Sequence, residues 1–240
     1  MQDTEPHTDM GNEDINQKIL QMRANAVMIV ERGSVVYGTT ITGKSDIDVV
    51  AIVPDEYQDL LSNYENGILE ANAVSRYLSK DEDWEFITLS DFKKMALDHT
   101  VLAMETLCTP WDYVRFCSWY DLLDFKKNLL PLDKWKIRQQ FSSTASNSWA
   151  KAHKKMTVEK DLDMYRGQKS LFHSLRILMF AIQLCERENI YNFGEARHLW
   201  YEIYDPSEKT TWEEYKKKYR PLYSSLRSKL AELAPKPKNS

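Results

Sequence analysis

The feature that most restricts the fold is a run of β-branched and apolar residues, IDVVAIV at 47–53, which ends at Pro54. Such a run is typical of a buried strand, and the proline stops it. Two aspartates separated by one residue, Asp46 and Asp48, stand at its beginning, and the preceding loop contains three of the seven glycines. The sequence therefore predicts a buried strand that begins with paired carboxylates directly after a flexible loop.

The remainder of the first half alternates helical and strand patterns. Residues 13–25 carry apolar side chains at helical spacing, and AVMIVE at 26–31 and DWEFITL at 83–89 predict two further strands. A helix is expected from SDFKKMALDH onward, with Ser90 as its N-terminal cap. Residues 55–80 are predicted to be a mixed helical and loop insertion.

The character of the chain changes near residue 112, beyond which long helical periodicities replace the β-branched runs. Three long helices are predicted, at 133–155, 160–188 and 211–234. We expect an α+β fold, with a small mixed β-sheet domain over 13–112 and an α-helical domain over 113–234. Residues 1–12 are expected to be disordered, and residues 235–240 are expected to form a tail.

Composition restricts the partners and the compartment. The net charge of −4 disfavours binding of extended duplex DNA through phosphate charge alone. No apolar run reaches the roughly 18 residues that span a bilayer, and the polar N-terminus has no signal-peptide core. A cytoplasmic protein without a membrane partner is therefore expected. Its three widely spaced cysteines favour neither disulfides nor a zinc site.

The paired aspartates favour a divalent cation. Asp46 and Asp48 are two apart in a predicted strand, so both side chains point to one face and repel each other unless a cation lies between them. Oxygen ligands at this spacing suit Mg²⁺ or Mn²⁺. Upstream, Gly33 permits a sharp turn that brings N–H groups close to an anion, and Ser34 adds a hydroxyl donor. The alternative is a plain hairpin whose aspartates face solvent.

The whole loop, GSVVYGTTITGKSDID at 33–48, is neither a Walker loop nor a GxGxxG motif. It resembles the signature of the DNA polymerase β nucleotidyltransferase superfamily, a Gly-Ser, a spacer, and then Asp-hydrophobic-Asp. It is more similar still to a group of predicted nucleotidyltransferases from bacteria and phages, and the similarity extends over roughly residues 27–185. The resemblance implies that the sheet domain is a polymerase β-like palm.

The resemblance also implies a third carboxylate on a later strand. Asp83 and Glu85 lie in the corresponding segment and alternate onto one face of the predicted strand. One of them is expected to complete the metal site with Asp46 and Asp48, and the sequence leaves open which one. Alternatively, both are exposed charges on the strand surface.

A basic stripe is expected on the helix that contains KSLFHSLRIL at 169–178. Lys169, His173 and Arg176 stand at i, i+4 and i+7, so they share one face and could hold the triphosphate of a nucleotide. Alternatively, they form a solvated face, with His173 hydrogen-bonded at the domain interface. Whether Glu105 pairs with this stripe is left open. Lys151, Lys154 and Lys155 are further candidates for contact with a polyanionic acceptor.

Together these features imply transfer of a nucleoside monophosphate from an NTP such as ATP to an acceptor, with release of pyrophosphate and with Mg²⁺ or Mn²⁺ as cofactor. The acceptor is unknown and could be a small molecule, a protein or an RNA end. The alternative from another class is a sensor or decoy that binds a nucleotide or an RNA end without catalysis.

Overall fold

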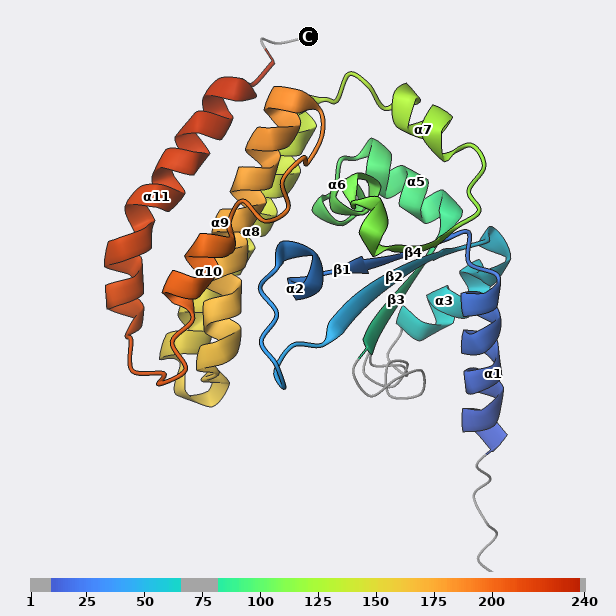
Figure 1. Ribbon diagram of the computed structural model, residues 1–240, viewed down its shortest axis with the longest axis horizontal. Helices are drawn as coiled ribbons and strands as arrows, with labels where there is room; N and C mark the ends of the chain where they lie inside the picture. Colours follow the sequence, from blue (N-terminus) through green and yellow to red (C-terminus); the bar gives the residue numbers. More distant parts are fainter. Residues whose placement is uncertain (1–9, 66–81, 238–240) are drawn as a thin grey trace, which may run out of the picture.

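The computed structural model describes residues 10–65 and 82–237, with side chains described within 17–61 and 82–237. Within these residues a mixed four-stranded sheet is formed by β1 (Met28–Arg32), β2 (Ile47–Val53), β3 (Glu82–Thr88) and β4 (Val114–Cys117) (Figure 1). The strand order is β3-β2-β1-β4; β1 is antiparallel to β2 and β4, and β2 is parallel to β3. The predicted α+β class and the three predicted strands are confirmed.

Helices surround this sheet and continue into a helical second half. They are α1 (Met10–Ala24), α2 (Ser34–Tyr37), α3 (Gln58–Glu65), α5 (Leu89–Leu97), α6 (Val101–Cys108), α7 (Leu122–Asn128), α8 (Lys134–Thr157), α9 (Met164–Arg187), α10 (Arg197–Ile203) and α11 (Trp212–Leu233). The three long predicted helices correspond to α8, α9 and α11. No helix in the described ranges is both long and apolar enough to cross a bilayer.

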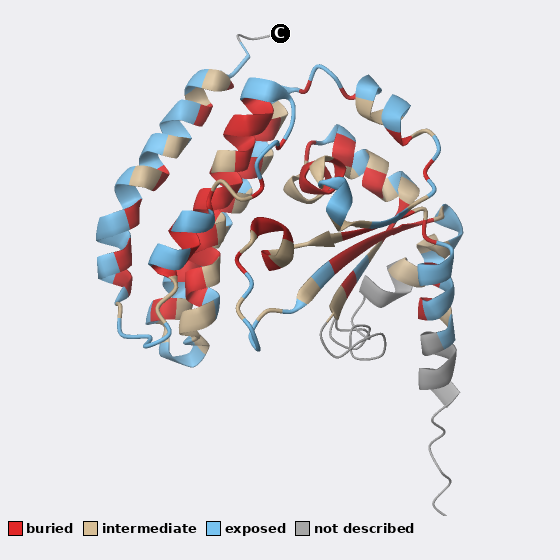
Figure 2. Cartoon of the chain, viewed as in Figure 1, coloured by how far each residue is buried: buried red, intermediate tan, exposed pale blue. Residues whose placement is uncertain are grey.

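Strand β2 is buried on both faces, which explains its continuous apolar run. Val49, Ala51 and Val53 belong to a core that includes side chains of α1 and α3. Val50 and Ile52 face the opposite way, into a larger core that includes α5, α6 and the helical half. The helices thus cover both faces of the sheet, and the strand interiors are buried (Figure 2).

Helix α9 is the centre of the helical half. Its residues are buried around most of the circumference, because it packs against α8, α10 and α11. Figure 2 displays this burial as a nearly continuous red band along the helix. A helix enclosed in this way holds its side chains in fixed positions, so residues on the side of α9 that faces the sheet are rigidly presented.

The boundaries differ from the predictions in two places. The sheet continues past residue 112, because β4 pairs antiparallel with β1 at the sheet edge. This strand has only four residues, too few to produce a detectable alternation in the sequence. Helix α1 begins at Met10, inside the stretch predicted to be disordered. The predictions for residues 1–9, 66–80 and 238–240 lie outside the described residues.

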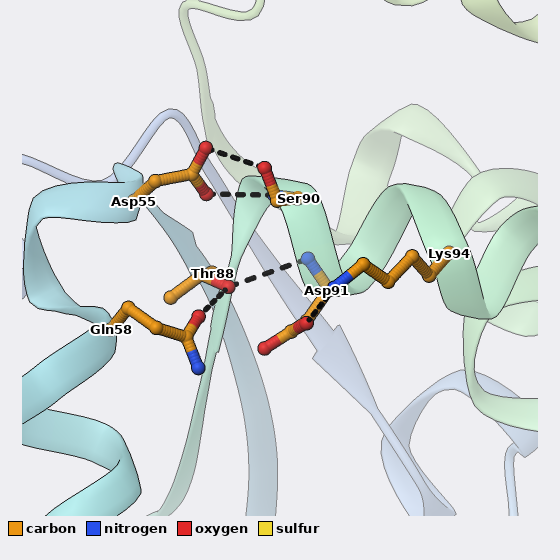
Figure 3. A network of polar contacts seen from close by, with 6 residues as sticks. All are labelled: Asp55, Gln58, Thr88, Ser90, Asp91 and Lys94. Carbon is orange, nitrogen blue, oxygen red and sulfur yellow. Dashed lines mark hydrogen bonds and ion pairs between the residues drawn. The ribbon is translucent and has the colours of Figure 1, made fainter.

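The predicted cap of helix α5 is wrong. Thr88 is the N-cap, and its Oγ1 accepts a hydrogen bond from the N–H of Asp91 and donates one to Gln58 Oε1 (Figure 3). Ser90 instead lies in the first turn, where its N–H and hydroxyl both donate to the carboxylate of Asp55. Because β3 ends at Thr88, the N-cap of α5 lies two residues earlier in the chain than the predicted cap, Ser90.

Replacing Thr88 by valine is expected to lower the free energy of unfolding by about 1 kcal/mol, because valine keeps the shape but loses both hydrogen bonds. For a chain of this size the melting temperature would fall by about 2–4 °C, which thermal unfolding followed by circular dichroism measures. Ser90→Ala, at an exposed position, should cost less. A larger loss for Ser90→Ala than for Thr88→Val would contradict the assignment of the cap.

Candidate functional site

A cleft of about 710 Å³ lies between the sheet and the two helices α8 and α9. Every residue predicted to bind the metal or the nucleotide lines it except Asp46. Of the three lysines predicted to contact an acceptor, Lys151 lines the cleft, whereas Lys154 and Lys155 are not among its lining residues. The polar lining consists of Arg32, Asp48, Asp83 and Glu85 from the sheet, Gly33, Ser34 and Tyr37 from the α2 turn, Glu105 from α6, Thr144, Ser148 and Lys151 from α8, and Lys169, Ser170, His173 and Arg176 from α9. The fold thus brings together residues that are more than 140 positions apart in the chain.

The sheet wall of the cleft is a row of charged side chains at one end of three strands. Arg32 is paired in register with Asp48, and Asp48 with Asp83. Register partners on adjacent strands point to the same face of a sheet, and in an antiparallel pair such as Arg32 and Asp48 their Cβ atoms lie about 4.5–5.5 Å apart. Asp46 precedes β2 instead of belonging to it and is not among the cleft-lining residues, whereas Asp48, which is also exposed, lines the cleft. The carboxylates of Asp48 and Asp83 are therefore neighbours, and that of Asp46 lies outside the cleft lining.

The environment of Asp48 disfavours its charged form. Its side chain is solvent-exposed where it lines the cleft, and partial desolvation by the surrounding protein is the largest cause of a raised pKa. The nearby cations Lys169 and Arg32 oppose the shift, whereas the negative charges of Asp83 and Asp46 add to it. A cation bound at Asp48 would relieve this repulsion.

The turn that precedes α2 packs directly on this carboxylate. Gly33 has φ +71° and ψ −145°, a conformation that side chains rarely adopt. A Cβ atom at this position would overlap Asp48 Oδ2. Only glycine therefore lets the backbone of the turn approach the carboxylate of Asp48. The two parts of the sequence motif, the Gly-Ser pair and the DID segment, are thus in contact in the fold.

Gly33→Ala is expected to destabilise the fold by roughly 1–3 kcal/mol through backbone strain and, in addition, to displace Asp48. The matched control is Gly43→Ala, since Gly43 also has positive φ, at +75°, but no atom lies near its added Cβ. The difference in melting temperature between the two variants then gives the cost of the contact with Asp48 apart from the cost of backbone strain. An equal loss in both would show that the approach to Asp48 carries no additional cost.

Glu85 and Asp83 have different partners. Glu85 is two register pairs farther along the strand, opposite Val50, and it is 59% exposed and 3.5 Å from Arg32 NH1. The Nε of Arg32 is buried and makes no hydrogen bond to any described residue. Asp83 is thus the carboxylate beside Asp48, and Glu85 is the counter-charge of Arg32.

The opposite wall of the cleft carries positive charge. Within the described ranges, neither Lys151 of α8 nor Lys169 of α9 lies within ion-pair distance of a carboxylate. Lys169 also lies over the ring of Tyr165 at 5.7 Å. Both ammonium groups are available to an anionic ligand held between the walls.

Arg176, by contrast, is already paired. Its NH1 donates to Glu105 Oε1 at 2.8 Å, and both side chains are at most 5% exposed. Tyr37 donates its hydroxyl to Glu105 Oε2 at 2.5 Å, and the guanidinium lies 3.9 Å from the Tyr37 ring centroid. The sequence left open whether Glu105 pairs with the basic stripe of α9, and the structure shows that it pairs with Arg176 of that stripe. The proposed role of Arg176 in nucleotide binding stays a prediction.

The surroundings of the half-buried His173 favour its uncharged form. Burial is the largest cause of a pKa well below its ordinary value, and Arg176, Lys169, Lys151 and Arg32 lower it further. The predicted basic stripe therefore consists of one available lysine, one arginine with a buried partner and one uncharged imidazole.

The donor set of the cleft suits a hard divalent cation. In the parts of the chain that the structure describes, no three His, Cys, Asp or Glu side chains form a ready-made metal site. Magnesium usually binds through one or two carboxylates and completes its octahedron with water and substrate phosphates. The neighbouring carboxylates of Asp48 and Asp83 match that requirement.

Two contributors were missed by sequence reasoning. Tyr37 lies inside the quoted motif, as the tyrosine of VVYG, and this was the available signal for its importance. Arg32 directly precedes the Gly-Ser pair but has no distinctive spacing of its own.

No protein-family model matches the chain, and no curated protein matches it with statistical significance. Its function must therefore be inferred from the site itself.

Proposed function

We propose that the protein is a nucleotidyltransferase that depends on a divalent cation and transfers a nucleoside monophosphate from an NTP to an acceptor. The observation that carries the proposal is the contact between the Gly33 turn and Asp48, beside Asp83 and across a cleft from Lys169. A phosphate-binding turn, paired carboxylates and an available cation are the parts that phosphoryl-group transfer requires. The resemblance of the loop to polymerase β-like enzymes supports the same reaction.

Asp48 and Asp83 would hold Mg²⁺ or Mn²⁺. Bound there, the cation neutralises phosphate charge and lowers the pKa of the acceptor hydroxyl. The fit follows from the chemistry of the donors, two oxygen ligands on adjacent strands whose mutual repulsion favours a cation. Asp46 would have to turn toward the cleft to contribute a third carboxylate.

The sheet wall and the helix wall of the cleft then bind the substrate from opposite sides. The triphosphate lies against the Gly33–Ser34 turn, and Lys169 pairs with its oxygens from the opposite side. The acceptor oxygen forms a bond to the α-phosphorus as the bond to the β-phosphate oxygen breaks, and pyrophosphate leaves. The acceptor proton passes to a carboxylate of the sheet wall or to water.

The nature of the acceptor follows from charge. A long nucleic acid favours a continuous basic channel, whereas this chain carries a net charge of −4. A small molecule or a protein hydroxyl therefore suits the protein better as acceptor.

The test is incubation with each of four α-labelled NTPs, Mg²⁺ or Mn²⁺, and a cell extract. We expect cation-dependent pyrophosphate release and transfer of label to one component. Release would support the enzyme; nucleotide binding without release would support the sensor function instead. Absence of both binding and release would contradict the proposal.

Lys169→Gln is expected to raise KM for the NTP by about 10–100-fold, because it removes one charge-assisted contact to phosphate. Initial rates at varied NTP concentration measure this effect. The matched control is Lys216→Gln, at an exposed position on α11 where Lys216 pairs with Glu213. An unchanged KM in the Lys169 variant would remove that residue from the site.

A further inference from the structure

A buried polar network forms part of the cleft lining and is not used by the mechanism above. It joins Glu105 of α6, Arg176 of α9 and Tyr37 of α2, each at most 4% exposed. Both carboxylate oxygens of Glu105 are engaged, one by Arg176 and the other by the Tyr37 hydroxyl. An ion pair buried this deeply seldom adds net stability over apolar packing, so its geometry suggests a positioning role.

The network ends at the cleft, on His173. The Nε of Arg176 donates to Nδ1 of His173 at 3.4 Å. Because Glu105 holds the guanidinium through NH1, the direction of this second hydrogen bond is set from α6. The ring of His173 is further enclosed by Tyr37 and Phe172.

This contact determines where the imidazole carries its proton. An uncharged imidazole that accepts at Nδ1 must be a donor at Nε2. No residue in the described ranges forms a hydrogen bond to Nε2, and His173 lines the cleft. The charged and titratable groups around the ring are Arg176 and Lys169 of α9, Lys151 of α8, Arg32 of β1, Tyr37 of α2 and Glu105 of α6. Most of them are positive, and with burial they keep the ring uncharged.

We propose that His173 donates its Nε2–H to a phosphate oxygen of the bound nucleotide, and that Glu105 and Arg176 are positioning residues that set this tautomer. The proposal rests on the nucleotidyltransferase function proposed above. Lys169 and Lys151 attract anionic oxygens to this part of the cleft, and an uncharged donor can bind such an oxygen without adding to the repulsion among the cations there. A charged histidine in the same place would add to it.

The tautomer is tested without any activity measurement, by long-range ¹H–¹⁵N correlation spectra of the protein labelled at histidine nitrogens. The His173 signals are assigned by their loss in His173→Gln. We expect an Nε2–H tautomer that does not titrate between about pH 5 and 8. Arg176→Lys keeps the positive charge but removes Nε, and it should give a mixture of tautomers. Arg187→Lys, on the exposed last turn of the same helix, should change nothing. An Nδ1–H tautomer or an imidazolium at neutral pH would overturn the proposal.

The ligand is tested with inorganic tripolyphosphate and Mg²⁺ as the probe. Binding should shift the Nε2 signal. His173→Gln, whose amide can donate from a similar position, should keep most of the affinity, whereas His173→Phe should bind about tenfold more weakly. Equal affinity for both variants would overturn the assignment of His173 as donor.

If the tautomer and the shift are found but no NTP releases pyrophosphate, the transferase function fails and the donor assignment stands. If transfer occurs and His173→Phe is as active as the wild type, only the donor assignment fails.

Discussion

Asp48→Asn is expected to abolish nucleotide transfer and to leave the protein folded. The amide has the shape of the carboxylate, so the approach of Gly33 is preserved, but the ligand charge beside Asp83 is lost. Cation catalysis contributes several kcal/mol to such reactions, and each 1.36 kcal/mol is a factor of ten in rate. We therefore expect a loss of at least about 10³-fold in kcat, measured as pyrophosphate release at saturating NTP.

The same variant should be no less stable than the wild type in the absence of metal. The folded-state pKa of Asp48 is raised above its ordinary value of 3.8, so its contribution to stability is present at low pH and is lost as pH rises through that raised pKa. Asparagine remains uncharged at every pH. With EDTA present, Asp48→Asn should melt above the wild type at neutral pH, and the difference should shrink on acidification to below the ordinary pKa of aspartate.

The control for both measurements is Asp124→Asn, at a position on α7 that is 77% exposed and forms a surface pair with Lys127. It should match the wild type in rate and, within about 0.5 kcal/mol, in stability. Full NTP turnover by Asp48→Asn, beside a normal Asp124→Asn, would remove Asp48 from the reaction.

Glu105→Gln is expected to give the largest loss of stability of any single polar substitution discussed. It leaves the guanidinium of Arg176 buried without a counter-charge and weakens the acceptor of the Tyr37 hydroxyl. Removing one partner of a buried ion pair typically costs 3–5 kcal/mol, which lowers the melting temperature by on the order of 10 °C at this chain length. Thermal or urea unfolding gives the value directly.

Two comparisons distinguish the effect of burial on stability from the effect of charge. Glu213→Gln removes an exposed i,i+3 pair with Lys216 and should cost less than about 1 kcal/mol. The double variant Glu105→Gln, Arg176→Met removes both charges and should be more stable than Glu105→Gln alone. A Glu105→Gln variant as stable as Glu213→Gln would contradict the buried pair.

Much of the framework could be predicted from local pattern. The run at 47–53 is a strand because its apolar residues are buried on both faces, and this leaves a continuous signal in the sequence. The long periodicities of the second half correspond to α8, α9 and α11, since each buries a helical stripe. The Gly-Ser and DID segments, fourteen residues apart from Ser34 to Asp48, could be predicted to form one site because their joint pattern resembles the polymerase β-like signature.

Tertiary structure decided the rest, where the partners come from distant segments. The parallel register of β2 and β3 places Asp83, and not Glu85, beside Asp48, and alternation along one strand cannot distinguish them. Arg176 is engaged by Glu105, which is 71 residues away, so its spacing on a helix face could not reveal that its charge is neutralised. Sequence determines which side chains share a face, through the fixed periods of strand and helix. Packing alone determines what lies opposite that face, and with it charge, burial and availability to a ligand.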